Sequence, residues 1–257
     1  MDDAPGLRSL LTFAPMIDSE VGRWVLVHHG VPYRETPHIF GWASVLSLFQ
    51  TGTTNIPLLH GNGPSVASAR AIVDYYDQNC PVEKRLVPAE ADLAAAVNAD
   101  WSRFNIVFGG AVAVVCYYHL LPHRAIMIEP FTRGVPELEA ISLDTNYAAY
   151  AGLINNLLQL SASGAQHALT RLQSIVAETD QRIADGRQYL VGDRFTLSDM
   201  ALATSAGPVL LPEHYGSPIP PFEVMPSELQ AIISELREHE TARFVERIYR
   251  QHRQSAT

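Results

Sequence analysis

The chain has 257 residues, 47% of them apolar, and its 27 acidic residues outnumber the 18 basic ones to give a net charge of −9. This length and apolar fraction suffice for a packed core in one large or two smaller domains, which excludes intrinsic disorder. An acidic chain without a Lys/Arg cluster does not attract phosphates or anionic lipids, so we expect no nucleic-acid partner and no membrane. Two cysteines, Cys80 and Cys116, exclude a disulfide scaffold and favour a reducing setting. The N-terminus has two acids and no basic region, which argues against a secretory signal and for a cytoplasmic protein.

The first 80 residues alternate short apolar runs with turn residues, which is typical of an α/β domain. The first predicted elements are a strand over residues 10–13, a helix that Asp18 or Ser19 caps and that stops at Gly30, and a strand over 33–39. A less regular stretch over 42–52 follows. The last elements are a hairpin over 56–66, with its turn at His60-Gly61-Asn62-Gly63, and a helix with apolar positions from Val66 to Tyr76.

Later residues favour helices, because their apolar positions recur at intervals of three and four. Pro81 and Pro88 mark a connection, and we predict a first domain over 1–80, a linker over 81–88 and an all-helical domain over 89–257. The predicted helices are one with the face Leu93, Val97, Trp101, Phe104 and Phe108, then 138–160, 169–183 and 242–252.

One segment raises the alternative of a membrane helix. Residues 104–123 contain no charged side chain and come close to the length that a membrane span requires. A central helix buried in a helical domain produces the same pattern, and no second such segment exists in the sequence. We therefore expect a buried helix here.

The best-defined local motif is a helix start at residues 195–199. Thr196 and Asp199 stand at the spacing of a capping box, and Phe195 and Met200 stand where a hydrophobic staple would form.

The motifs together resemble the glutathione S-transferase family over about residues 7–250. The stretch 189–203 resembles the capping-box segment of that family's helical domain, and Gly30-Val-Pro-Tyr33 matches the motif after its first helix. Ile56-Pro57-Leu58-Leu59 matches the element that carries the family's cis proline, and Ala69-Arg-Ala-Ile72 lies where the family has Ser-x-Ala-Ile. The resemblance implies a thioredoxin-like N-terminal domain followed by a helical bundle domain, and a homodimer.

It also implies a glutathione site in the first domain. The main chain of Ile56, before Pro57, would bind the cysteinyl part of the tripeptide, and the start of the second helix would hold the γ-glutamyl end. Here the family's acid-Ser pair is replaced by Ser68-Ala69. His38 and Gln50 are candidate contacts for the glycine end.

The position of the family's catalytic Ser or Cys falls on Met16, which cannot donate a hydrogen bond. Ser19, three residues later, is the candidate catalytic hydroxyl, and the alternative is that Ser19 or Asp18 only caps the helix. A thiolate is needed in either case, because the thiol is a poor nucleophile.

The resemblance further places an apolar pocket for the electrophile against the helical domain. Met16, Trp101, Phe104 and Asn105 are its candidate residues, with core packing as the alternative for each aromatic. The proline-rich stretch 207–222 is too rich in proline for a helix and is expected over the cleft mouth as a lid or rim.

These residues lead to two hypotheses about function. In the first, the protein is a glutathione-dependent enzyme acting on a small hydrophobic electrophile by conjugation, ether cleavage or isomerisation. In the second, it keeps the fold but has lost or changed the thiol site, and acts as a ligand-binding or interaction module or as a glutathione-independent enzyme. No metal is expected: His119 and His123 are separated by Pro122, His28-His29 suits a helix end, and Cys80 and Cys116 are interpreted as a linker thiol and a core thiol.

Overall fold

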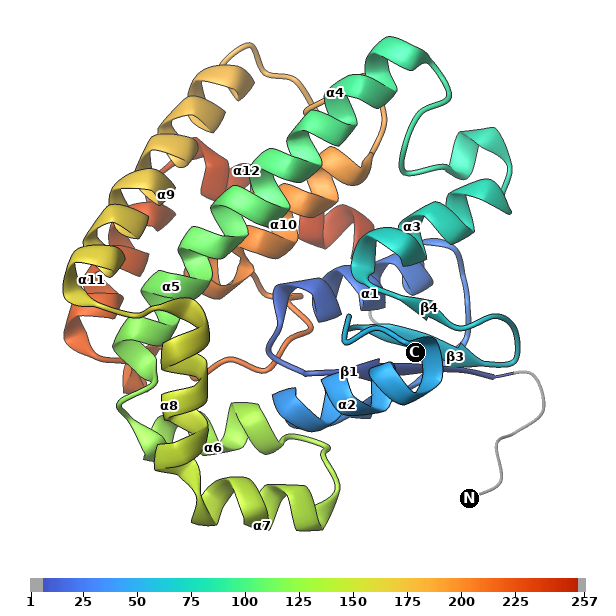
Figure 1. Ribbon diagram of the computed structural model, residues 1–257. Coiled ribbons are helices and arrows are strands. Elements are labelled where there is room, and N and C mark those ends of the chain that lie inside the picture. Colours follow the sequence, from blue (N-terminus) through green and yellow to red (C-terminus); the bar gives the residue numbers. More distant parts are fainter. Residues whose placement is uncertain (1–6, 254–257) are drawn as a thin grey trace.

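The structure is a computed structural model that describes residues 7–253. Strands β1 (Arg8–Thr12), β2 (Tyr33–Pro37), β3 (Leu58–Gly61) and β4 (Val66–Ala67) form one sheet in the order β2-β1-β3-β4. β2 runs parallel to β1, whereas β3 is antiparallel to β1 and β4 to β3. Helices α1 (Ile17–His28) and α3 (Ala69–Gln78) pack together on one face, and α2 (Phe40–Thr51) lies on the other (Figure 1). This is the predicted thioredoxin-like arrangement.

The hairpin between β3 and β4 follows the prediction. Leu58 pairs with Ala67 and Leu59 with Val66, and the Ile56-Pro57 peptide bond is cis. Ser68 is the N-cap of α3, and its hydroxyl oxygen accepts a hydrogen bond from the amide of Ala71. β1 begins two residues before the predicted strand.

Two predictions for the first domain were wrong. The stretch 42–52 is not irregular but forms most of α2, which ends at Gly52 with a φ of 75°. Its fully buried residues are the small Ala43 and Ser47, while Trp42, Val45, Leu48 and Phe49 are exposed, so a strong core-facing apolar stripe is missing. Neither Asp18 nor Ser19 caps α1, because the N-cap is Met16.

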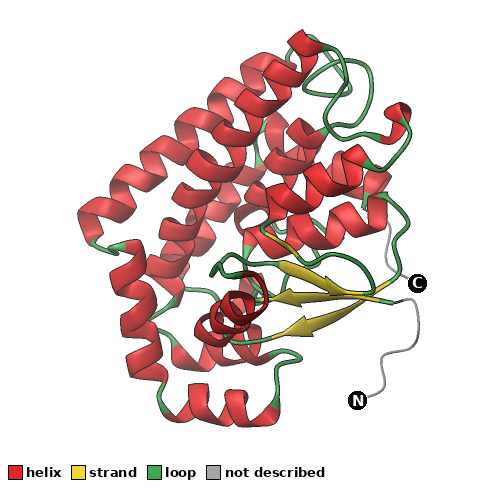
Figure 2. Cartoon of the chain, turned by 45° about the vertical axis from the view of Figure 1, so that its right-hand side comes forward, coloured by secondary structure: helices red, strands yellow, loops and turns green. Residues whose placement is uncertain are grey.

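The remainder of the described chain is mainly helical and lies beside the sheet and its covering helices (Figure 2). The elements in chain order are η1 (Val82–Lys84), α4 (Ala91–Trp101), the π-helical η2 (Ser102–Phe108), α5 (Gly109–Leu120), α6 (Arg124–Thr132), α7 (Glu137–Thr145), α8 (Tyr147–Leu158), α9 (Ala162–Ile183), α10 (Leu197–Leu210), η3 (Phe222–Val224), α11 (Ser227–Arg237) and α12 (Glu240–His252).

Elements α4, η2 and α5 join into one continuous helix, Ala91–Leu120. By length and composition alone this helix could cross a membrane. It packs against α9 and α10, and Phe104, Phe108 and Val112 are buried. This is the core packing that the sequence predicts for the uncharged segment.

Elsewhere the helix boundaries differ from prediction. The predicted helix over 138–160 is two helices, α7 and α8, that meet at Asn146 with a φ of −112° and a ψ of 26°. The helix predicted over 169–183 begins earlier, at Ala162, where the Ser161 hydroxyl accepts from the amide of Gly164. α10 continues to Leu210 although it contains Pro208, so the predicted loss of helix at residue 207 was wrong.

The predicted capping box of α10 is confirmed. The amide of Thr196 donates to one oxygen of the Asp199 carboxylate at 2.9 Å, and the amide of Leu190 donates to the other at 2.8 Å. Phe195 stacks on His252, with ring centroids 4.4 Å apart. The motif thereby fixes the start of the central helix and its contact with the end of α12.

A buried ionic network holds the sheet and the end of the chain together. Glu20 is fully buried and accepts from Arg23 at 3.3 Å and from Arg253 at 2.9 Å. Arg23 also pairs with Glu35 at 2.7 Å and donates to Ser217 at 2.8 Å. Charges withdrawn from water are stabilised only where they are paired and hydrogen-bonded, and here each acid has a guanidinium partner.

Candidate functional site

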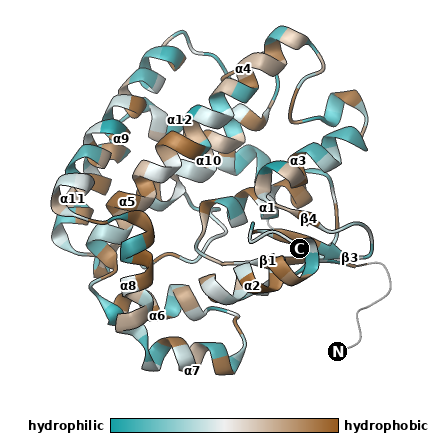
Figure 3. Cartoon of the chain, viewed as in Figure 1, coloured by the Kyte–Doolittle hydropathy of each residue, from teal (hydrophilic) through white to brown (hydrophobic). Residues whose placement is uncertain are grey.

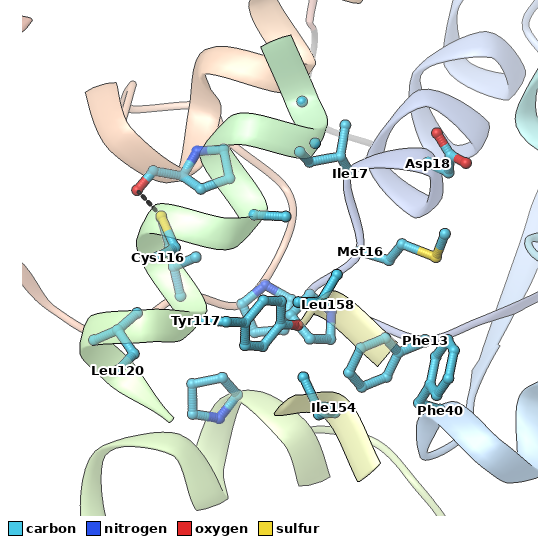
Figure 4. A pocket seen from close by; sticks show the side chains of 18 of the residues that line it. Phe13, Met16, Ile17, Asp18, Phe40, Cys116, Tyr117, Leu120, Ile154 and Leu158 are labelled. Carbon is cyan, nitrogen blue, oxygen red and sulfur yellow. Dashed lines mark hydrogen bonds between the residues drawn. The ribbon is translucent and has the colours of Figure 1, made fainter. Parts of the chain in front are cut away.

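A cavity of about 480 Å³ lies between the sheet and the helical part (Figure 4). Its walls come from the start of α1, from η2 and α5, from α8 and from the proline-rich segment after α10. Most lining residues are apolar, among them Phe13, Phe40, Tyr117, Leu120, Ile154 and Leu158. Such a cavity suits an apolar ligand, because the ligand's surface leaves water on entry.

Asp18 is the acidic residue among those that line the cavity. Its side chain accepts a hydrogen bond from the Asn105 amide at 2.9 Å, so the pair joins α1 to η2 across the cavity wall. Burial raises the pKa of Asp18, and the bond from Asn105 opposes that rise. A carboxyl group with a raised pKa at a ligand cavity is a candidate for proton transfer.

The start of α1 borders the same cavity through Pro15, Met16 and Ile17. Met16, the N-cap, makes no side-chain capping bond. Among the described residues, no hydrogen bond uses the amides of Ile17 and Asp18. Unpaired amides at a helix N-terminus carry partial positive charge, and they form a site that favours an anion.

Ser19 is not placed at this cavity. Its side chain is fully buried, and its hydroxyl donates to the carbonyl of Phe13 at 2.8 Å. The residue belongs to the first turn of α1 rather than to its cap, so it turns inward toward the preceding loop. The hydroxyl predicted to act in catalysis is therefore committed to the main chain.

The four residues predicted for the apolar pocket divide into two groups. Met16 and Asn105 line the cavity. Trp101 and Phe104 do not: they are 8% and 3% exposed and belong to the hydrophobic core. Both lie in the part of the long helix, α4 and η2, that contacts α10, and core packing is the alternative that the sequence left open for them.

The main-chain elements predicted to bind glutathione lie at one corner of the sheet. Ile56 and Pro57 are buried, and the carbonyl of Pro57 accepts from the amide of Ser68 at 2.9 Å. Ser68 has a φ of 103° and a ψ of 150°, a conformation that residues other than glycine rarely adopt. Ala69 is buried, and neither it nor Ser68 lines the cavity.

His38 lies just before α2, and Gln50 lies near its end. His38 contacts Glu139 of α7 at 2.7 Å, and the same carboxylate accepts from the amide of Ile39 at 3.0 Å. Gln50 is exposed near the end of α2. His38 thus joins the two parts of the chain, and its predicted contact with the glycine end of glutathione stays a prediction, as does that of Gln50.

The proline-rich segment forms part of the cavity wall, as predicted. Pro218, Ile219 and Pro220 line the cavity together with Pro208 at the end of α10. Cys116 also lines it, with its Sγ 4.0 Å from the carbonyl oxygen of Pro208. Burial raises the pKa of the Cys116 thiol to about 12, so this thiol is not a nucleophile at neutral pH.

Neither a protein-family model nor a curated protein sequence matches the chain. Solved structures do. A glutathione S-transferase from Xanthobacter autotrophicus Py2 is 14% identical over 94% of this chain and 92% of its own, with a TM-score of 0.59. One from Methylobacterium radiotolerans JCM 2831, in complex with glutathione sulfonate, is 19% identical over 94% and 90%, with a TM-score of 0.56. FzlA from C. crescentus is 14% identical over 93% and 91%, with a TM-score of 0.54.

These likenesses cover nearly the whole length of both chains in each comparison. Each has a TM-score above 0.5, so the likeness is one of the whole fold. The chain therefore has the glutathione S-transferase fold, a thioredoxin-like domain followed by a helical domain, as its sequence motifs predicted.

Proposed function

We propose that the protein is a glutathione-dependent enzyme that acts on a small hydrophobic electrophile. The observation that carries this proposal is the position of the unpaired α1 amides at the wall of an apolar cavity of about 480 Å³. The amides favour a thiolate at the same place where the cavity accepts an apolar partner. Conjugation, ether cleavage and isomerisation all begin from such a thiolate.

Asp18 is our candidate for the group that takes the proton from the thiol. Burial raises the pKa of this carboxyl, which brings it closer to the pKa of a thiol and improves it as a base. When the proton moves, the negative charge passes from Asp18 to the sulfur, which then attacks the electrophile while the leaving group departs with its bonding electrons. Asn105, bonded to Asp18 at 2.9 Å, would hold the carboxyl in place.

The corner at Ile56 and Ser68 supports the binding of the tripeptide. Among the described residues, no hydrogen bond uses the main chain of Ile56, or the amides of Ala69 and Arg70 at the start of α3. The strained backbone of Ser68 costs about 1–3 kcal/mol, a cost that proteins accept mainly at ligand sites. A compared structure that holds glutathione sulfonate adds support from the same fold.

The second hypothesis, an apolar ligand bound without glutathione, has its own supporting observations. Met16 offers no hydrogen bond to sulfur, and Ser68-Ala69 lacks the acid of the family's pair. Titration calorimetry with glutathione separates the two hypotheses. A heat of binding that S-methylglutathione abolishes by competition supports the first hypothesis. The absence of heat at millimolar glutathione, while an apolar dye still binds in the cavity, would establish the second.

The role of Asp18 is tested by Asp18→Asn, with glutathione-dependent turnover of a halogenated aromatic electrophile as the assay. We expect kcat/KM to fall by about 10²–10⁴, the usual contribution of a general base. Asp92→Asn is the matched control, since Asp92 is also in the first turn of a helix but is exposed and away from the cavity. Full activity in Asp18→Asn would remove Asp18 from the reaction.

The alternative candidate, Ser19, is tested by Ser19→Ala. This variant should retain turnover, and loss of turnover in it would return the catalytic role to Ser19.

We infer further that two copies of the chain pair through the exposed face of α2. Trp42, Val45 and Phe49 are spaced so that they lie on one face, and Phe49 is 84% exposed. Figure 3 shows hydrophobic colour on α2. Light scattering should give the mass of a dimer for the native protein and of a monomer for Phe49→Asp. An unchanged mass in the variant would place the contact elsewhere.

A further inference from the structure

Three side chains that commonly bind metals meet where α1, α3 and the connection to the helical domain come together. His29 directly follows α1, Asp77 lies in the last turn of α3, and Cys80 lies just beyond that helix. One ring nitrogen of His29, one carboxylate oxygen of Asp77 and the Sγ of Cys80 all lie within 4.8 Å of one another. None of the three residues lines the cavity described above.

His29 has a ring nitrogen without a partner inside this cluster. Its side chain is only 4% exposed, and its Nε2 is buried without a hydrogen-bond partner. The distance from Nε2 to Oδ1 of Asp77 is 3.8 Å, too long for a hydrogen bond. A buried polar atom without a partner costs free energy, so its position calls for a partner that the protein alone does not supply.

The ring of His29 is held in place by an aromatic neighbour. The ring stacks on Tyr76, with centroids 5.3 Å apart and an angle of 21° between the planes. The ring nitrogen is therefore fixed in direction.

The carboxylate of Asp77 is held in place by the connection between the domains. The amides of Leu86 and Val87 donate to its two oxygens, each at 2.8 Å. Each oxygen keeps a further lone pair, and bonds of this kind orient carboxylates that bind metals. Cys80 is half-buried, and its thiol donates weakly to the carbonyl of Asp77 at 3.7 Å.

A nitrogen, an oxygen and a sulfur donor together suit Zn²⁺, whereas Mg²⁺ and Ca²⁺ prefer oxygen alone. Ligand atoms about 2.0–2.3 Å from a tetrahedral zinc lie roughly 3.3–3.7 Å from each other, so small side-chain movements bring this cluster to that geometry. We propose that His29, Asp77 and Cys80 bind one Zn²⁺, with a water at the fourth position. The ion would displace the thiol proton of Cys80 into solvent and fasten α1 and α3 to the interdomain connection.

The experiment uses the full chain, reduced and stripped of metal with a chelator, and titrated with Co²⁺ as a spectroscopic probe. We expect one equivalent to bind, with a near-ultraviolet thiolate-to-cobalt absorption that Zn²⁺ then removes. Cys80→Ser should lose this absorption, while Cys116→Ser, the matched control, should keep it. The Kd for Zn²⁺ should rise at least about 10-fold in His29→Ala and in Cys80→Ser.

Zn²⁺ should also raise the melting temperature of the native protein and of Cys116→Ser, but not that of Cys80→Ser. The proposal is overturned if stoichiometric Co²⁺ gives no thiolate absorption in the native protein, or if the absorption persists in Cys80→Ser. The first of these two results is measured on the native protein. It therefore tests the proposal even if a variant fails to fold. Glutathione turnover is not part of the readout, so this test is independent of the proposed enzyme activity.

Discussion

Replacing Asp199 by alanine should destabilise the whole helical domain. This buried carboxylate accepts from the amides of Leu190 and Thr196, at 2.8 and 2.9 Å, and from the Thr196 hydroxyl at 3.1 Å. Alanine leaves two buried amides without an acceptor, and each such amide costs about 1–3 kcal/mol. The expected loss is therefore about 2–6 kcal/mol. For a chain of this size that lowers the melting temperature by roughly 4–12 °C, at about 2 °C per kcal/mol.

The loss is measured by urea unfolding near neutral pH, followed by the far-ultraviolet circular dichroism of the helices. Asp193→Ala is the control, because Asp193 lies in the same loop but is exposed, and its loss should stay within about 0.5 kcal/mol. The slope of the unfolding free energy against urea should be the same in both variants. If Asp199→Ala loses less than about 1 kcal/mol, the two amides find other acceptors and the reasoning from the capping box is refuted.

Three further outcomes are expected. Gly207→Ala should lower the unfolding free energy by about 1–3 kcal/mol in thermal melts, because an added Cβ would lie 2.1 Å from the half-buried Tyr215 ring; an unchanged melt would show that the ring moves freely. Gly152→Ala should raise it by about 0.5–1 kcal/mol, since the added Cβ meets nothing within 4 Å and alanine favours the helix; a loss instead would reveal a hidden contact. Burial raises the pKa of Asp199 to about 6, so the folded state binds the carboxyl proton more tightly than the unfolded state does. The stability that this proton contributes is complete below about pH 4, and it is lost as the pH rises through about 6. The unfolding free energy of the native protein relative to Asp199→Asn should thus decrease from about pH 4 to pH 7 in parallel urea titrations, and a flat difference would contradict the raised pKa.

Local signals in the sequence predicted the parts of the fold that depend on neighbouring residues. The capping box needs only Thr196 and Asp199, and the hairpin needs a turn between two apolar runs; both are found. The helix α2 was missed because its core-facing residues are the small Ala43 and Ser47, which give no apolar stripe. Nothing in residues 102–108 indicated the π-helical turn that places Asn105 beside Asp18.

The candidate site depended more on tertiary contacts, and the sequence predicted less of it. Met16 was correctly placed at the start of α1, at the cavity. The inward turn of Ser19 follows from its bond to Phe13, which no spacing in the chain reveals. In the same way, His29 and Asp77 are 48 positions apart in the chain, and only the packing of α1 on α3 brings them together.

The ionic network around Glu20 has a consequence for the order in which the protein can be built. Glu20 emerges early in synthesis, whereas Arg253, one of its two guanidinium partners, is added 233 residues later. Until Arg253 is in place, Glu20 has Arg23 as its remaining guanidinium partner, so the first domain reaches its final stability only when the last helix has formed and docked.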